Sequence, residues 1–264
     1  MPYFPLLTAP GCTGRTTVFN FPPNNWEKQS KNKKFVNLTW QHGSKWKTVV
    51  IDEIQYGEFK VYDESTLVSY TSSSNLALLS LSNTVFPSTS LSLPPSNLYF
   101  EVPTWRASLE LLSLSTSTST SYQGEVDPFP SSGSLLSFSP FFQPKPLVRN
   151  YLLFLNLECF PAIRSANIQI FRSTHFDEPV LVSSVFSNSI TCVSLDNLGF
   201  QSDDLVIISS KEISGIPLFL TVSDDYSFMS LEHTHPPASY VIHGNRWAAQ
   251  KHLKNRWFNN LNLS

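Results

Sequence analysis

Most of the chain is divided into short runs of β-prone residues by closely spaced turn signals. The alternating runs Lys34–Trp40 and Lys45–Ile51, for example, flank a turn that contains Gly43. Similar runs follow at Leu76–Leu81, Leu98–Val102, Trp105–Tyr122, Tyr151–Cys159, Ala166–Arg172, Val180–Phe186, Ile190–Leu195, Leu205–Ser209 and Pro217–Val222. Prolines between the runs are typical of strand ends and sheet corners. Roughly a dozen short strands with regular turn signals predict an all-β fold.

We expect these strands to form an antiparallel β-sandwich with jelly-roll or immunoglobulin-like layers. The proline-containing stretch Phe141–Leu147 is the best internal boundary, so the strands form either one domain or two β subdomains. The expected parts are residues 1–33 as an arm, 34–140 as a first β-rich half, 147–230 as a second β-rich half, and 231–264 as a histidine-containing turn followed by a helix.

The expected N-terminal arm is rich in proline, which removes backbone donors and disfavours helix. Aromatic side chains are interleaved with the prolines: Tyr3, Phe4, Phe19, Phe21 and Trp26. An extended arm with this apolar content should pack against another surface, because exposing so much apolar area to water is unfavourable. Both its own domain and a neighbouring subunit offer such a surface, and the second alternative makes these residues candidate partner contacts.

The end of the chain has the pattern of an amphipathic α-helix. From Asn245 onward, apolar residues recur at spacings near three and four, at Trp247, Ala249, Leu253, Trp257, Phe258 and Leu261. The basic residues of the segment, which have no acidic counterpart, are Arg246, Lys251, Lys254 and Arg256. Such a helix either contacts an acidic partner or anionic surface, or exposes its basic side to water while its tryptophans anchor it to the core.

Composition narrows the class of partner. The formal net charge of −2 does not favour nucleic acid or an anionic membrane. The longest apolar run, Tyr151–Phe160, is far shorter than the roughly 20 residues that cross a bilayer, and the chain starts without the basic region of a secretory signal. We therefore expect a soluble, cytoplasmic protein.

Three scattered cysteines, at 12, 159 and 192, favour free thiols, with a Cys159–Cys192 bridge as the alternative.

One short segment concentrates histidine. His233 and His235 form an H-x-H pair, whose imidazoles would project from one face of a strand. With His243 as a third ligand, they could bind zinc or another divalent metal, and Glu232 could act as the base of a metal-dependent hydrolase. The other interpretation is that these imidazoles hydrogen-bond the turn and the start of the helix, because Pro236 and Pro237 end the strand directly after the pair.

A second segment, Gly124-Glu-Val-Asp127, is similar to the start of the G-E-x-D-x-x-E signature of laminarinase-type glycoside hydrolases, which are jelly rolls. In that family the signature implies a carboxylate nucleophile and a carboxylic acid. The position of the second glutamate is Pro130 here, so no acid–base residue carries over. A surface turn or an oxygen cluster for calcium are the other interpretations of Glu125 and Asp127.

Taken together, these signals favour a non-catalytic β-sandwich protein that binds a protein partner or itself through the arm and the basic helix. This hypothesis requires no cofactor. The metal-dependent hydrolase is the alternative. A second alternative is a carbohydrate-binding module, in which exposed tryptophans among Trp40, Trp46 and Trp105 stack on sugar rings.

Overall fold

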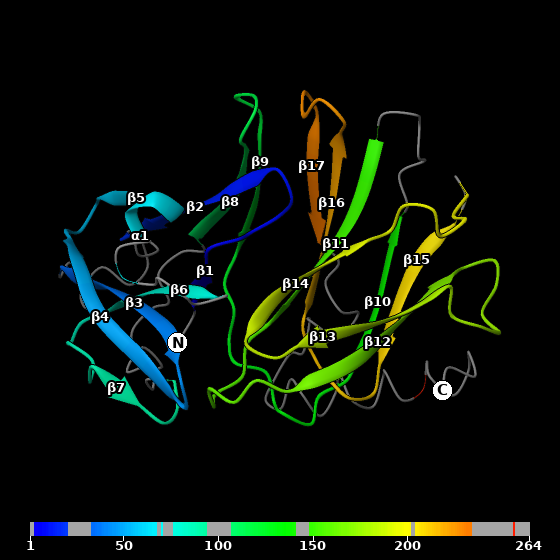
Figure 1. Cartoon of the computed structure of the whole chain (residues 1–264). Coiled ribbons are helices and arrows are strands. Elements are labelled where there is room, and N and C mark those ends of the chain that lie inside the picture. The colour runs from blue at the N-terminus through cyan, green and yellow to red at the C-terminus, as the bar shows by residue number, and fades with distance from the viewer. Residues whose placement is uncertain are drawn as a thin grey trace. The chain divides into compact units, whose positions relative to one another are not determined.

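The computed structural model (Figure 1) describes residues 3–20, 33–67, 70, 76–93, 107–140, 148–201, 204–233 and 256. These residues form antiparallel strands in four sheets, together with the four-residue helix α1 (Glu64–Leu67). The all-β class predicted from the sequence is therefore confirmed. Within the described residues, no helix has the length and apolar character that crossing a membrane would require.

The chain divides into two compact units that differ from the expected halves. Unit 1 comprises Met1–Pro128 and Leu157–Ala162, and unit 2 comprises Phe129–Asn156 and Ile163–Ser264. The sequence placed residues 34–140 together, but strand β10 (Leu135–Pro140) pairs along its whole length with β15 (Leu205–Ser210) of unit 2. The proline-rich stretch at 141–147 therefore follows a strand of unit 2 and does not mark the boundary between the units.

Unit 1 contains two sheets. The first has the order β1-β6-β3-β4-β7, with bounds β1 (Phe4–Pro5), β6 (Ala77–Ser82), β3 (Lys34–His42), β4 (Lys45–Ile54) and β7 (Thr89–Ser90). The second has the order β5-β2-β8-β9, with bounds β5 (Phe59–Asp63), β2 (Cys12–Phe19), β8 (Ala107–Ser113) and β9 (Ser119–Gly124). The expected hairpin joins β3 to β4, and Gly43 supplies its turn with a φ of 61°.

The N-terminal residues that the structure describes are part of unit 1. Tyr3 and Phe4 are each only 1% exposed, and Tyr3 exchanges two backbone hydrogen bonds with Val126. Residues 12–19 form β2, which lies between β5 and β8 (Figure 1). The expected extended arm is thus integrated into the sheets over residues 3–20. The physical reason is the alternation of β2, in which every second side chain is buried.

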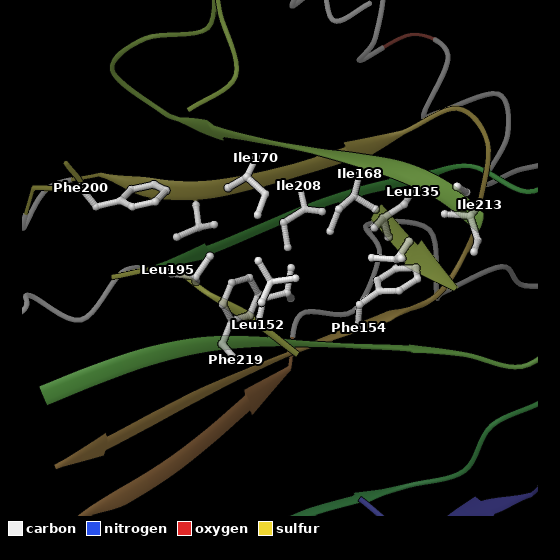
Figure 2. Packing of buried hydrophobic residues seen from close by; sticks show 14 residues of the cluster. Leu135, Leu152, Phe154, Ile168, Ile170, Leu195, Phe200, Ile208, Ile213 and Phe219 are labelled. Carbon is white, nitrogen blue, oxygen red and sulfur yellow. The ribbon is translucent and has the colours of Figure 1, made fainter. Parts of the chain in front are cut away.

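Unit 2 also contains two sheets. One has the order β10-β15-β12-β13, with β12 at Ser165–Arg172 and β13 at Leu181–Phe186. The other has the order β14-β11-β16-β17, with bounds β14 (Ser189–Ser194), β11 (Val148–Asn156), β16 (Ile216–Ser223) and β17 (Met229–His233). The hydrophobic core combines side chains from both sheets. In Figure 2, Ile168, Ile170 and Ile208 of one sheet point toward Leu152, Phe154 and Phe219 of the other.

The expected C-terminal helix lies outside the described residues, with a single exception. Arg256 is exposed and has helical backbone geometry. The amphipathic helix therefore stays a prediction.

Candidate functional site

One face of the sheet β5-β2-β8-β9 is open to solvent. In β2 and β8 buried side chains alternate with partly exposed ones, which is the pattern of a sheet that packs on a core with one face only. The strand registers place the exposed positions of all four strands on the same side. We call this side the outer face of unit 1, and it consists of Thr13, Arg15, Thr17, Phe19, Phe59, Val61, Asp63, Ser108, Glu110, Leu112, Ser119, Ser121 and Gln123.

An apolar group lies at the β5 side of the outer face. Phe19 is directly opposite Phe59 in the ladder, and their ring centroids are 6.2 Å apart with the planes tilted by 40°. Phe59 is 60% exposed and the neighbouring Val61 is 46% exposed. Two apolar side chains, about half exposed or more, therefore contact water on the outer face of the sheet. Scattered exposed apolar residues are ordinary, but adjacent ones on a flat sheet are typical of contact surfaces.

Charged groups occupy the middle of the outer face. Arg15 donates from Nε to Oε2 of Glu110 over 2.7 Å, and its Nη2 lies 2.6 Å from the same oxygen. These two residues face each other across β2 and β8, and Asp63 lies opposite Arg15 on the other side. The Arg15 side chain is 39% exposed, so the ion pair contributes little to stability, although it fixes where the guanidinium lies.

Asp63 has a structural role at the start of α1. Its Oδ1 accepts hydrogen bonds from Ser65 Oγ at 2.6 Å, from Thr66 N at 2.8 Å and from Thr66 Oγ1 at 2.8 Å. The bond from Ser65 and the bonds from Thr66 lower the pKa of Asp63 below its ordinary value, because they stabilise the carboxylate. This carboxylate is thereby held as the N-terminal cap of the short helix.

The edge strand β9 adds hydroxyl and amide groups to the outer face. Ser119, Ser121 and Gln123 are exposed and lie opposite Leu112, Glu110 and Ser108 of β8. The sequence is rich in Ser and Thr over residues 115–121, and this run is divided between a turn and the edge strand. In the turn, Ser113 Oγ accepts hydrogen bonds from the backbone amides of Ser115 and Thr116. The outer face therefore combines exposed apolar side chains with exposed hydroxyl and amide groups.

The histidine segment is only partly described. His233 ends β17 opposite Leu218, and Glu232 lies opposite Phe219. Because consecutive strand residues project to opposite faces, the structure does not bring Glu232 and His233 together on one face. His235 and His243 lie outside the described residues. Within the described part of the chain, no group of three or more His, Cys, Asp or Glu side chains is placed to hold a metal ion.

The predicted partner contacts fall into four groups. Phe19 is on the outer face of unit 1. Tyr3 and Phe4 are buried, so an unchanged unit 1 cannot offer them to a partner. Arg256 is exposed, and the remaining members, Phe21, Trp26, Arg246, Lys251 and Lys254, lie outside the described residues.

The residues considered for carbohydrate chemistry are mostly enclosed. Trp40 is 5% exposed and Trp46 is fully buried, so neither ring is a stacking platform, while Trp105 lies outside the described residues.

Asp127 follows Val126, whose backbone pairs with Tyr3. Burial, followed by the charges of Cys159 and Asp127, raises the pKa of the Tyr3 phenol well above its ordinary value. This tyrosine therefore stays protonated at neutral pH.

The three cysteines are free thiols. Desolvation raises the pKa of Cys12 and of Cys192 to about 11 in each case, and it also raises the pKa of Cys159. Thiols with such values are almost entirely protonated at neutral pH and are weak nucleophiles. A catalytic cysteine is therefore not favoured.

A polar cluster in unit 2 has the composition of a catalytic triad but the wrong order of bonds. Thr174 Oγ1 donates to Oδ1 of Asp204 over 2.6 Å, and His175 Nδ1 lies 3.2 Å from the same hydroxyl. An activated hydroxyl donates to the histidine, which in turn donates to the carboxylate. Here the hydroxyl is bonded to the carboxylate directly. Asp204 also accepts from the Gln201 amide at 2.9 Å, so it joins two loops.

We expect Asp204→Asn to lower the free energy of unfolding of unit 2 by about 1–3 kcal/mol at pH 7, because a buried carboxylate that accepts several bonds is replaced. Burial raises the pKa of Asp204, but the bonds from Thr174 and Gln201 and the charge of Arg172 lower it by more. A lowered folded-state pKa gives stability that is present above the ordinary aspartate pKa of about 4 and is lost as the pH falls through the folded value.

Urea unfolding between pH 7 and pH 2.5 measures this effect. The difference between the parent protein and Asp204→Asn should shrink below about pH 4, whereas Asp177→Asn, at an exposed position of the β12–β13 loop, should match the parent throughout. If the difference in the free energy of unfolding between the parent and Asp204→Asn stays constant with pH, the charge of the Asp204 carboxylate is not the cause of the stability loss.

Comparison with known proteins gives no relative: no protein-family model, no curated protein and no solved structure matches this chain. The functional argument therefore depends on the geometry of the chain itself.

Proposed function

We propose that this protein is a non-catalytic binding protein, whose outer face of unit 1 contacts a protein partner. We also propose that the two sheets of unit 2, which share one hydrophobic core, form a β-sandwich that serves as a scaffold. The observation that carries the proposal is the pair of largely exposed apolar side chains, Phe59 and Val61, next to Phe19 on an ordered sheet. Burying them against a partner would gain hydrophobic free energy at little cost in backbone order.

A protein surface suits this face better than a small ligand does. Small ligands bind in concave sites that enclose most of their surface, whereas the outer face consists of side chains that project from four neighbouring strands. An apolar group beside the Arg15–Glu110 pair and exposed hydroxyl groups has the mixed apolar and polar composition of a protein interface. Arg15 can donate further hydrogen bonds, because a guanidinium carries more donors than Glu110 uses.

The test compares two double variants of the full chain. Phe59→Ser with Val61→Thr removes the apolar group of the outer face, and Val85→Thr with Leu91→Ser removes similarly exposed apolar residues elsewhere in unit 1. Both variants should keep the melting temperature of the parent protein, because they alter exposed side chains. The parent and each variant are used as bait in affinity capture, and the captured proteins are quantified by mass spectrometry. Captured proteins are then purified, and calorimetry measures their dissociation constants for the parent and for each variant.

We expect a partner that binds the parent and the Val85/Leu91 variant equally, and that binds the Phe59/Val61 variant at least roughly tenfold more weakly, as for truncated interface anchors. Equal binding to both variants would show that the outer face is not the contact surface. Enzymatic turnover that depends on His233 would instead support the metal-dependent alternative.

A further inference from the structure

Among the described residues, strand β13 is an edge of unit 2 without a neighbouring strand on its outer side. It is the last strand in the order β10-β15-β12-β13, and among the described strands it pairs with β12 alone (Figure 1). Proteins usually protect such edges with charged residues, proline or a bulge. The sequence Leu181-Val-Ser-Ser-Val-Phe186 contains neither a charge nor a proline, and its register with β12 is uninterrupted. Val182 and Phe186 are 53% and 45% exposed.

The hydrogen bonds at the end of β13 show which backbone groups point outward. Ser187 N donates to Arg164 O at 3.0 Å, directly beyond the end of the β12–β13 ladder. Hydrogen-bonding positions alternate along an antiparallel strand, so Val185, Ser183 and Leu181 also direct their backbone groups toward β12. The N–H and C=O groups of Val182, Ser184 and Phe186 therefore point away from β12. Those of Phe186 bond locally, since its N donates to Thr191 Oγ1 and its O accepts from Ser189 Oγ. Within the described part of the chain, the outward groups of Val182 and Ser184 stay available to another strand.

We propose that β13 pairs with β13 of a second copy of this chain, in antiparallel orientation about a two-fold axis at Ser183. In this register Val182 lies opposite Ser184 of the second copy, and each exchanges both of its outward hydrogen bonds with the other. A two-fold axis perpendicular to the sheet relates the same face of the two copies, so residues that lie opposite each other must share a face. Val182 and Ser184 meet this requirement, because they are two residues apart on one strand.

The second copy is favoured over an unrelated strand for two reasons. The register uses the two outward-bonding residues that are not bonded locally and leaves the Phe186 bonds to Thr191 and Ser189 intact. The absence of charge in β13 means that two copies meet without like-charge repulsion, which would oppose a symmetric pair of charged edges. The inference concerns unit 2 and is independent of the outer face of unit 1.

Cysteine cross-linking tests the register directly. In a chain with Cys159→Ser and Cys192→Ser, Ser183→Cys places two thiols opposite each other at a non-hydrogen-bonded pair, where the Cα atoms are about 4.5 Å apart and a disulfide can form. Ser184→Cys in the same background is the matched control, because its counterpart in the second copy lies about two residues further along the strand. We expect mild oxidation to convert the first variant to a covalent dimer and to leave the second mostly monomeric.

Sedimentation equilibrium of the full chain provides the second measurement. The parent protein should dimerise with rising concentration, and Ser184→Pro should raise the dissociation constant at least roughly tenfold, because proline removes an outward N–H without breaking the ladder to β12. A monomeric parent at millimolar concentration would overturn the proposal, as would equal cross-linking of the two cysteine variants. A dimer lost in the Phe59/Val61 variant but kept in Ser184→Pro would assign dimerisation to the outer face of unit 1 instead.

Discussion

Replacing Phe154 by alanine should lower the free energy of unfolding of unit 2 by about 3–5 kcal/mol, the usual cost of truncating a fully buried aromatic residue. Phe154 is fully buried in β11, among side chains contributed by both sheets of the unit (Figure 2). Its ring also packs over Gly215, where an added Cβ would come within 2.4 Å of the Phe154 Cζ atom. Backbone lies directly beside the ring, so the surrounding structure can collapse only partly into the cavity.

The control for this variant is Phe228→Ala, in the connection between β16 and β17, where the side chain is 50% exposed. We expect the control to change the free energy of unfolding by less than about 0.5–1 kcal/mol, since little apolar area leaves water on folding at that position. Urea unfolding followed by hydrogen exchange and mass spectrometry measures both variants and assigns the loss of protection to unit 2. Similar losses in the two variants would show that the shared core does not dominate the stability of the unit.

The position of Phe154 shows what the sequence could predict about the fold. The run Tyr151–Cys159 was recognised as a strand because it is continuously apolar and too short for a membrane span. The pairing of β11 with β14 and β16 could not be predicted, since those partners lie some 40 and 70 residues further along the chain and local patterns carry no information about them. The same limit explains the misplaced boundary, because only the pairing of β10 with β15 assigns residues 135–140 to unit 2.

The N-terminal residues show how a correct local rule gave an incomplete result. Prolines at positions 5 and 10 do exclude helix, and the structure has none there. Proline is also tolerated in edge strands, and Pro5 lies in β1, at the edge of its sheet. The alternation of burial over Cys12–Phe19 comes from the structure, because the buried face includes Gly14 and Thr16 while Phe19 is on the partly exposed face.

The candidate site was predicted in part. Phe19 was among the predicted partner contacts, whereas its neighbours Phe59 and Val61 were missed. The alternation of Glu58–Tyr62 predicts a strand whose charged positions, Glu58 and Lys60, face water, whereas in the structure the apolar positions Phe59 and Val61 are exposed. The β2–β5 register decides this by placing Phe59 and Val61 opposite Phe19 and Thr17. Strand parity alone would have placed Glu232 and His233 on opposite faces, although both were assigned to one candidate metal site.

Replacing Trp46 by alanine should destabilise unit 1 by about 3–5 kcal/mol, comparable to the effect of Phe154→Ala on unit 2. Trp46 is fully buried in β4, and its indole Nε1 donates to the Cys159 carbonyl oxygen at 2.9 Å. The segment Leu157–Ala162 belongs to unit 1, although the chain on either side of it belongs to unit 2. This hydrogen bond and the one from Leu93 N to the same oxygen, at 2.8 Å, hold the segment in unit 1.

Trp46→Phe separates the hydrogen bond from the packing. It keeps most of the buried ring, and the Cys159 carbonyl remains bonded to Leu93 N, so no acceptor is left unsatisfied. We therefore expect a loss of about 1–2 kcal/mol, most of it from reduced ring volume. Hydrogen exchange should show faster exchange in peptides that cover 157–162 for both variants, and a larger effect for Trp46→Ala. Equal losses in the two variants would mean that the indole hydrogen bond, rather than the buried ring, keeps the segment in unit 1.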